Sequence, residues 1–309
     1  MGKNLMTTAG SSHGLYYTAS LFFKKGATVF VEDPTYFLAF IVLRNDLELN
    51  VVPVGLDSEG INMQSLEENV KKYIKFSKDA NNNMFDGMLY IIPAHQNPTG
   101  LCYSEKRCKE IVKLARQYNL LVFCDDVYNL LSYSGPAIPP VFYYDNPSDP
   151  DFKGNVISNC TFSKLLGPGL RLGWFQTSEN ILDKFIQSGV MKSGGCPNNY
   201  TAGILASIME LGLLDETLSI LLQDYKGGFF VWITLPPGVD AEKLAAFTKE
   251  KYDVSVLPGN RCSVEGNSKN CIRIAYTFHE EKIVFESVLR LCSGIKEYLS
   301  LAKVISNRV

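Results

Sequence analysis

Two short, uninterrupted apolar runs constrain the fold of this chain more than any other feature. They are Met88–Ile92 and Leu120–Cys124, and strands that are apolar on both faces are typical of a parallel sheet covered by helices on both sides. A third run that favours β-structure spans Asn155–Phe162, and strand and helix patterns alternate between residues 6 and 175. The sequence therefore predicts an α/β fold in which a mostly parallel sheet is sandwiched by helices.

The composition changes after Leu222. Strand patterns at Gly227–Leu235, 254–257 and Cys271–Tyr276 are interleaved with helical patterns at 241–251 and Glu280–Leu301. Strands followed by a packed helix are typical of a small α+β domain. The sequence therefore predicts a large domain at residues 1–222 and a smaller C-terminal domain at residues 223–309.

Composition and charge exclude several classes of function. The 309 residues are 46% hydrophobic and 20% charged, with a net charge of -2, which is ordinary for a soluble globular protein. Without a long basic run, nucleic acid and anionic membranes are not expected as partners. No apolar run reaches membrane-spanning length and the N-terminus shows no signal pattern, so a cytoplasmic location is predicted.

Neither a metal site nor a disulfide framework is expected. The eight cysteines are scattered without a CxxC pair, and His13, His95 and His279 lie far apart in the sequence. Reduced, mostly buried thiols are the ordinary state of such a chain.

The stretch from Asn159 to Gly173 carries the strongest chemical signal. Lys164 follows a β-favouring run, and a desolvated lysine at the end of a buried strand has a lowered pKa and a nucleophilic amine. Hydroxyls at Thr161 and Ser163 and the guanidinium of Arg171 could hold a phosphate dianion. A lysine nucleophile beside a phosphate cradle suits pyridoxal 5′-phosphate. The alternative is a surface loop with an incidental lysine and arginine.

Other candidates follow predicted strands. Ser11 and Ser12 lie in a small-residue turn that opens a helix, an arrangement that suits an anion but is common in βα turns. Tyr36 could lie flat on an aromatic ligand or simply pack in its loop. Asn97 lies between two prolines after the Met88–Ile92 strand, at the edge where α/β sheets bind ligands.

Two charged positions have a functional and a structural interpretation. Asp125 ends the Leu120–Cys124 strand and could pair with a pyridinium nitrogen, or it could cap a helix or form a local ion pair. Arg273 stands inside a short strand, where a bidentate carboxylate is the best-fitting partner. Alternatively, Arg273 lies on the solvent face of its sheet.

Seven motifs in this order resemble the class I/II aminotransferases, the fold-type-I enzymes that use pyridoxal phosphate. The closest branch contains the aminoadipate, kynurenine and aromatic aminotransferases, with the related domains of bacterial regulators. The motifs cover nearly the whole chain and comprise Gly10–Leu15, Glu32–Tyr36, His95–Gly100, Asp125–Tyr128, Thr161–Gly173, Gly227–Trp232 and Arg273.

The resemblance implies pyridoxal phosphate as cofactor and a role for each catalytic position. Lys164 would hold the internal aldimine and move the proton between the substrate Cα and the cofactor. Asp125, rather than its neighbour Asp126, would pair with the pyridine nitrogen. Asn97 and Tyr128 would hydrogen-bond the phenolic oxygen of the ring. Tyr36 would stack on the ring.

The resemblance also implies the phosphate site, the substrates and the assembly. Arg273 would clamp the α-carboxylate of an amino acid whose amino group passes to a 2-oxo acid, and the enzyme would be a homodimer. The phosphate would be held by Ser11, Ser12, Thr161 or Ser163, and Arg171.

The chain departs from the family pattern in two places. Most of the family's segment before Gly10 is missing, and only Thr217–Lys226 stand where the family has a long helix and a strand. These departures indicate a truncated or alternatively spliced form, or an imperfect gene model. They raise the alternative of a catalytically impaired homologue with a binding or regulatory role. A β-lyase or decarboxylase is a further alternative, because pyridoxal phosphate supports all three reactions. Arg273 favours reactions that retain the α-carboxylate.

Overall fold

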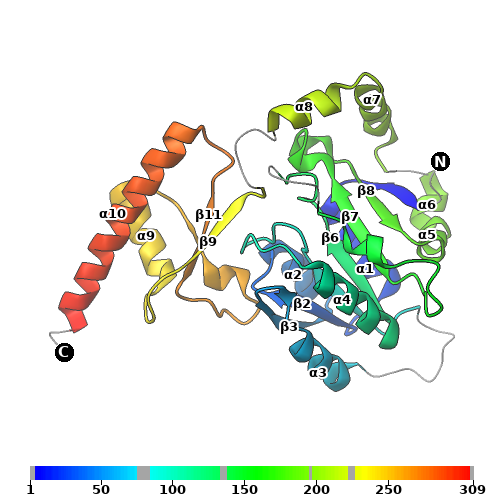
Figure 1. Cartoon of the computed structure of the whole chain (residues 1–309), viewed down its shortest axis with the longest axis horizontal. Helices are drawn as coiled ribbons and strands as arrows, with labels where there is room; N and C mark the ends of the chain where they lie inside the picture. Colours follow the sequence, from blue (N-terminus) through cyan, green and yellow to red (C-terminus); the bar gives the residue numbers. More distant parts are fainter. Residues whose placement is uncertain (1–3, 75–83, 133–137, 195–196, 222–226, 307–309) are drawn as a thin grey trace. The chain divides into compact units, whose positions relative to one another are not determined.

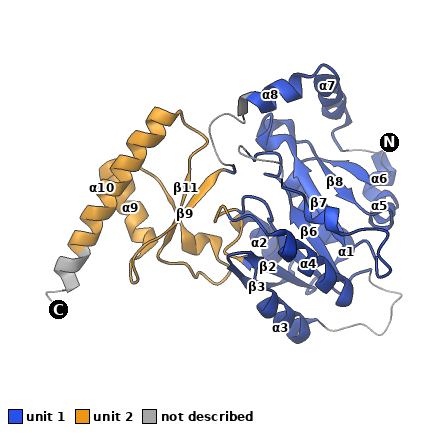
Figure 2. Ribbon diagram, viewed as in Figure 1, with its two compact units in different colours: residues 1–32, 38–96, 101–228 blue, residues 33–37, 97–100, 229–309 orange. Residues whose placement is uncertain are grey.

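The computed structural model of the chain describes residues 4–74, 84–132, 138–194, 197–221 and 227–306 (Figure 1). The chain divides into two compact units (Figure 2). Unit 1 contains residues 1–32, 38–96 and 101–228, and unit 2 contains residues 33–37, 97–100 and 229–309. Unit 2 thus includes two short loops from the first half of the chain. The domain boundary predicted at residue 222 lies outside the described residues.

Unit 1 is built on an eight-stranded sheet with the strand order β1-β8-β7-β6-β5-β2-β3-β4. Its strands are β1 (Leu5–Thr8), β2 (Thr28–Asp33), β3 (Asn50–Asp57), β4 (Gly60–Ile61), β5 (Gly87–Ile91), β6 (Leu120–Asp125), β7 (Val156–Thr161) and β8 (Gly173–Thr177). β2, β5, β6 and β7 pair in parallel, whereas β8 is antiparallel to both β7 and β1. This arrangement confirms the predicted α/β fold.

Helices follow most of these strands. They are α1 (Ser11–Phe22), α2 (Phe37–Ile41), a π-helical turn (Val42–Asp46), α3 (Met63–Tyr73), α4 (Glu105–Gln117), α5 (Glu179–Ile186), α6 (Gly189–Gly194), α7 (Asn199–Glu210) and α8 (Leu213–Leu221). Short 3-10 turns lie at Val141–Tyr144, Phe162–Lys164 and Pro168–Leu170. Ser104 caps α4, because its hydroxyl accepts a hydrogen bond from the backbone N–H of Arg107 at 3.1 Å.

The alternation of side chains along β6 assigns its residues to two faces of the sheet. Val122 and Cys124 belong to a buried cluster that includes Ile111 of α4. Phe123 faces the other way and contacts Phe175, with ring centroids 6.3 Å apart. Phe175 in turn packs on α5, and α1 also lies against β7 and β8. α4 therefore covers one face of the sheet, and α1 and α5 cover the other.

Unit 2 contains a three-stranded antiparallel sheet in the order β10-β11-β9. Its elements are β9 (Phe230–Thr234), α9 (Ala241–Tyr252), β10 (Leu257–Pro258), a 3-10 turn (Gly259–Cys262), β11 (Cys271–Ala275) and α10 (Glu281–Ser306). A separate core of Leu235, Leu244, Ile272 and Leu291 joins the sheet to its helices. The strand predicted at 254–257 is shorter and later, at Leu257–Pro258. Among the helices that the structure describes, none has the length and apolar character needed to cross a membrane.

A buried ion pair fixes the carboxyl end of α4. The Arg116 side chain is 6% exposed and the Asp145 side chain is fully buried; Arg116 Nη2 lies 2.9 Å from Asp145 Oδ1. Replacing Arg116 with methionine would leave the Asp145 carboxylate without this partner inside the protein. We expect the free energy of unfolding in urea to fall by about 3–5 kcal/mol.

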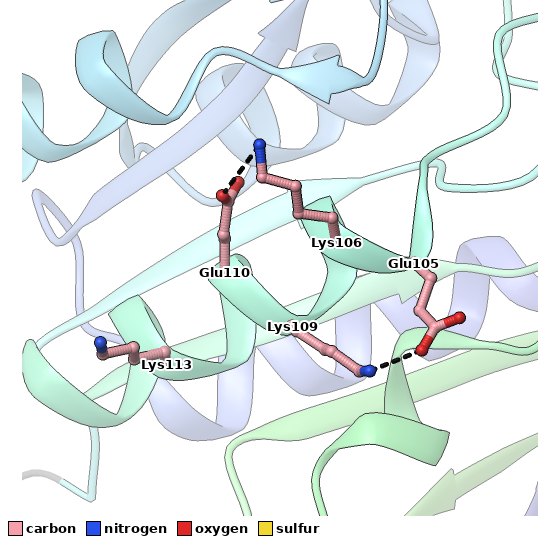
Figure 3. A pocket seen from close by; sticks show the side chains of 5 residues that line it. All are labelled: Glu105, Lys106, Lys109, Glu110 and Lys113. Atoms are coloured by element: carbon pink, nitrogen blue, oxygen red, sulfur yellow. Dashed lines mark hydrogen bonds and ion pairs between the residues drawn. The ribbon is translucent and has the colours of Figure 1, made fainter.

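Lys109→Met is the matched control for this prediction. Lys109 lies on the same helix and pairs with Glu105 at 2.5 Å, but both side chains are more than half exposed (Figure 3). An exposed pair contributes little to stability, so its removal should leave the unfolding midpoint unchanged. Equal effects of the two substitutions would contradict the buried-pair argument.

Candidate functional site

The amino end of α1 forms an open, positively charged turn. The helix begins at Ser11, so the small-residue turn forms its first residues, and Gly10, with a φ of 94°, acts as the N-cap. No side chain caps this end, and Ser11 and Ser12 occupy the first turn. Backbone N–H groups and the helix dipole at such an end favour a negatively charged ligand.

Arg171 lies directly over this turn. Its Nη2 donates to the carbonyl oxygen of Ala9 at 3.0 Å, and its Nη1 donates to that of Pro168 at 3.1 Å. A Cβ atom added to Gly10 would lie only 2.6 Å from Arg171 Nη2, so a larger residue would displace the guanidinium. Burial and the Arg171 charge also lower the pKa of His13 in the same turn. The structure therefore brings together the helix end, its serines and a cation.

Strand pairing places two further hydroxyls at this edge of the sheet. Thr161, the last residue of β7, pairs with Gly173, which also pairs with Thr8 just before the turn. The Thr161 hydroxyl donates to Ser163 Oγ at 2.9 Å. Because β8 is antiparallel, its amino end, which follows Arg171, lies beside the carboxyl ends of the parallel strands.

Asp125 ends β6 on the face of the sheet that α1 covers. Its Oδ2 accepts a hydrogen bond from Tyr90 Oη, and its Oδ1 accepts one from Asn159 Nδ2, both at 2.9 Å. Burial raises the pKa of Asp125 to about 6, although both hydrogen bonds and the charge of Lys164 act to lower it. The carboxyl group is therefore oriented by two donors and can bind a proton near neutral pH.

Lys164 lies just beyond β7, in the 3-10 turn Phe162–Lys164, and is half-buried. The positive charge of Lys164 acts to lower the pKa of Asp125. Tyr128, three residues after Asp125, is buried, with 3% of its surface exposed. Because β6 and β7 pair in parallel, Asp125 and Lys164 follow neighbouring strands at the same edge of the sheet.

The adjacent aspartates face opposite sides of the sheet. Asp126 Oδ2 accepts a hydrogen bond from Ser158 Oγ, away from the face that carries Asp125. Burial, with a contribution from the Asp125 charge, raises the pKa of Asp126 to about 7. The alternation of a strand therefore separates two carboxylates that the sequence presents side by side.

In unit 2, two of the predicted residues contact each other. Arg273 of β11 donates from Nη1 to Asn97 Oδ1 at 2.8 Å, and its guanidinium lies 4.1 Å from the centroid of the Phe230 ring. Arg273 is therefore packed against protein rather than directed to the solvent. Asn97 is buried, with 4% of its surface exposed.

Tyr36 lies in the short loop 33–37 of unit 2 and is half-buried. Two hydrogen bonds fix this loop: Thr35 N–H to the carbonyl oxygen of Cys262 at 2.8 Å, and Val264 N–H to Asp33 Oδ1 at 3.0 Å. These two hydrogen bonds hold the loop at Asp33 and Thr35, just before Tyr36.

Sequence reasoning missed Tyr90 and Asn159, the two donors to Asp125. Tyr90 is the one residue with a polar group in the side chains of the otherwise apolar β5, Asn159 lies between Ser158 and Cys160 in β7, and both are fully buried. Asn159 stands two residues before Thr161 and therefore on the same face of β7. That spacing was the available signal, but the pairing of Asn159 with Asp125 across the sheet depends on register.

The donor set on unit 1 fits pyridoxal phosphate. A phosphate matches the uncapped end of α1 with Arg171, a protonated ring nitrogen matches Asp125, and the aldehyde matches the amine of Lys164. The charged depression along α4 offers no such set, since Lys106 pairs with Glu110 and Lys109 pairs with Glu105 (Figure 3). We therefore place the candidate site at the α1-covered edge of the sheet.

Comparison with known proteins identifies the class of this fold and site. The sequence model described as "Aminotransferase class I and II" matches residues 2–211. The aromatic-amino-acid aminotransferase 1 of Thermococcus litoralis is 30% identical over 95% of this chain and 73% of its own length. The chain belongs to the class I and II aminotransferase family.

Solved structures agree with this assignment. The multiple substrate aminotransferase of Thermococcus profundus superposes with a TM-score of 0.83 and 28% identity, over 96% of this chain and 76% of that structure. The α-aminoadipate aminotransferase LysN of Thermus thermophilus, solved with N-(5′-phosphopyridoxyl)-L-leucine, gives a TM-score of 0.82 and 26% identity over 97% and 78%. The predicted family, its aminoadipate and aromatic branch, and the aminotransferase class are thereby confirmed.

The match to the Thermococcus litoralis protein extends over 318 residues, more than the whole length of this chain. The relative therefore has residues inside the matched region that this chain lacks. Part of the short connection predicted at Thr217–Lys226, residues 222–226, lies outside the described ranges.

Proposed function

We propose that this protein binds pyridoxal phosphate and transfers an amino group from an amino acid to a 2-oxo acid. The observation that supports this most is that Asp125 and Lys164 follow the paired strands β6 and β7 at the edge of the sheet where α1 begins without a side-chain cap. Pyridoxal phosphate, when bound, supplies an aldehyde that carries the amino group and a ring that accepts an electron pair. The family membership supports transamination over the β-lyase and decarboxylase alternatives.

The roles of the chain's own residues follow from their chemistry. The amine of Lys164 would attach the cofactor and then move a proton at the substrate Cα. The Asp125 carboxylate would hold the proton on the ring nitrogen. Ser11, Ser12 and Arg171, with Thr161 or Ser163, would bind the phosphate. Asn97 and Tyr128 would hydrogen-bond the phenolic oxygen, and Tyr36 would stack on the ring.

Absorbance spectroscopy tests this proposal directly. Purified protein mixed with pyridoxal phosphate should show the visible band of a covalently bound cofactor, and an amino donor alone should convert it to the pyridoxamine form. Aromatic amino acids and 2-aminoadipate, with 2-oxoglutarate as acceptor, are the first substrates to test because of the relatives' names. A stable band that no donor converts would support the impaired, regulatory homologue instead.

Arg273 is expected to bind the substrate α-carboxylate. Replacing Arg273 with lysine keeps the charge but removes the planar two-donor fork. We expect KM for the amino donor to rise about tenfold or more, with a smaller change in kcat. Steady-state kinetics measure this effect, and Arg290→Lys on the exposed face of α10 is the control. An unchanged KM would contradict the assignment of Arg273.

A homodimer is also part of the proposal. Large apolar side chains are exposed on α6 and α7 and just after α7, including Val190 (59% exposed), Tyr200 (83% exposed) and Leu211 (73% exposed). Such exposure is typical of a surface that another protein chain covers. Analytical ultracentrifugation would show a single dimeric species if the proposal holds, and a monomer at all concentrations would contradict it.

A further inference from the structure

Asn159 connects two parts of the candidate site through a single amide group. The residue is fully buried in β7, and its Nδ2 donates to Asp125 Oδ1 at 2.9 Å. The same Nδ2 donates to the carbonyl oxygen of Ser11 at 3.2 Å. The carboxylate at the end of β6 and the first turn of α1 are therefore linked by one side chain.

Stability alone does not explain an asparagine at position 159, because its buried environment leaves one polar atom unpaired. Its Oδ1 is buried and has no hydrogen-bond partner among the residues described. A buried polar atom without a partner destabilises the folded state. A Cβ atom at Gly14 would lie 2.3 Å from this Oδ1, so α1 approaches β7 closely at this point. An apolar side chain of similar size would avoid the unpaired oxygen but would lack the two hydrogen bonds.

We propose that Asn159 is a positioning residue that fixes Asp125 relative to the phosphate-binding turn of α1. The inference rests on the proposed function, because it assigns Asp125 to the ring nitrogen and the α1 turn to the phosphate of one cofactor. The distance between a ring nitrogen and a phosphate is set by the covalent structure of the cofactor. A shared amide bridge holds the two protein groups at a matching separation.

Tyr90 provides a matched comparison. Its hydroxyl donates a hydrogen bond to the other carboxylate oxygen of Asp125, Oδ2, and this hydrogen bond does not involve α1. Both hydrogen bonds lower the pKa of Asp125 against the effect of burial. Removing either donor should therefore shift the shared proton from the ring nitrogen towards the carboxylate. Only the removal of Asn159 should also loosen the phosphate-binding turn.

The experiment compares wild type, Asn159→Leu and Tyr90→Phe. The ¹⁵N chemical shift of pyridoxal phosphate labelled at its ring nitrogen reports whether that nitrogen carries a proton. Both variants should lose the ring-nitrogen proton at lower pH than wild type. Equilibrium binding of pyridoxal phosphate and of pyridoxal, which lacks the phosphate, reports on the α1 turn. Asn159→Leu should weaken the phosphorylated form selectively, by about fivefold to tenfold for one lost hydrogen bond.

Three outcomes would overturn the proposal. Asn159→Leu could match wild type in both the ¹⁵N shift and the ratio of the two affinities. Both variants could change that ratio equally, which would remove the link to α1. Asn159→Leu could lower the thermal midpoint without moving either readout, which would make Asn159 purely structural. If Asn159→Leu does not fold, Asn159→Thr replaces it in the experiment, because threonine is favourable in a strand. Wild type that binds no pyridoxal phosphate would instead contradict the proposed function itself.

Discussion

Lys164→Ala is expected to lower kcat/KM for transamination by about 10⁴-fold or more, because the variant loses both the attaching amine and the proton carrier. The visible band of the covalently bound cofactor should disappear as well. Steady-state kinetics with an amino donor and 2-oxoglutarate, together with absorbance spectra, measure the two effects.

Two further variants make this prediction specific. Lys164→Arg retains a positive charge near Asp125 but lacks a nucleophilic amine, so it should be as inactive as Lys164→Ala. Lys106→Ala removes an exposed lysine on α4 and should leave the kinetics unchanged (Figure 3). A Lys164→Ala protein that keeps the visible band would show that another lysine attaches the cofactor.

Asp125→Asn is expected to have opposite effects on activity and on stability. A neutral amide lacks the negative charge that keeps the ring nitrogen protonated. We expect kcat to fall by about 10²- to 10³-fold, as is typical when an enzyme loses one group that stabilises charge in the transition state. The cofactor-free protein should nevertheless become more stable at neutral pH. The reason is that burial disfavours the ionised carboxylate in the folded state.

The pH dependence gives the sign of this stability effect. The pKa of Asp125 is about 6 in the folded protein, compared with an ordinary value of 3.8. Between these values the folded state binds more protons than the unfolded state, so the wild type loses stability as the pH rises. The variant should gain up to about 3 kcal/mol above pH 6 and nothing below about pH 4.

Urea unfolding of the cofactor-free wild type and variant at a series of pH values measures this difference. Asp126→Asn is a useful comparison, because burial also raises the pKa of Asp126, to about 7, but on the opposite face of the sheet. It should show a similar pH-dependent gain with a much smaller loss of activity. A stability difference for Asp125→Asn that does not change with pH would contradict the assigned pKa.

The sequence allowed the elements that carry chemistry to be predicted because each has a strong local signal. The apolar runs at Met88–Ile92 and Leu120–Cys124 became β5 and β6. The start of α1 depends on the positive φ of Gly10, which apolar periodicity does not indicate. The strand at Leu257–Pro258 was misplaced because it is too short for an alternating pattern to define it.

By itself, the sequence determined the fold class, the family and a list of polar residues that follow strands, because apolar runs, caps and motifs are local properties of the chain. Only the tertiary structure decided which of these residues meet. The register of β6 against β7 brought Asn159 to Asp125, and the antiparallel β8 brought Arg171 over Gly10. Register and strand order depend on contacts between distant segments, and no local pattern encodes them.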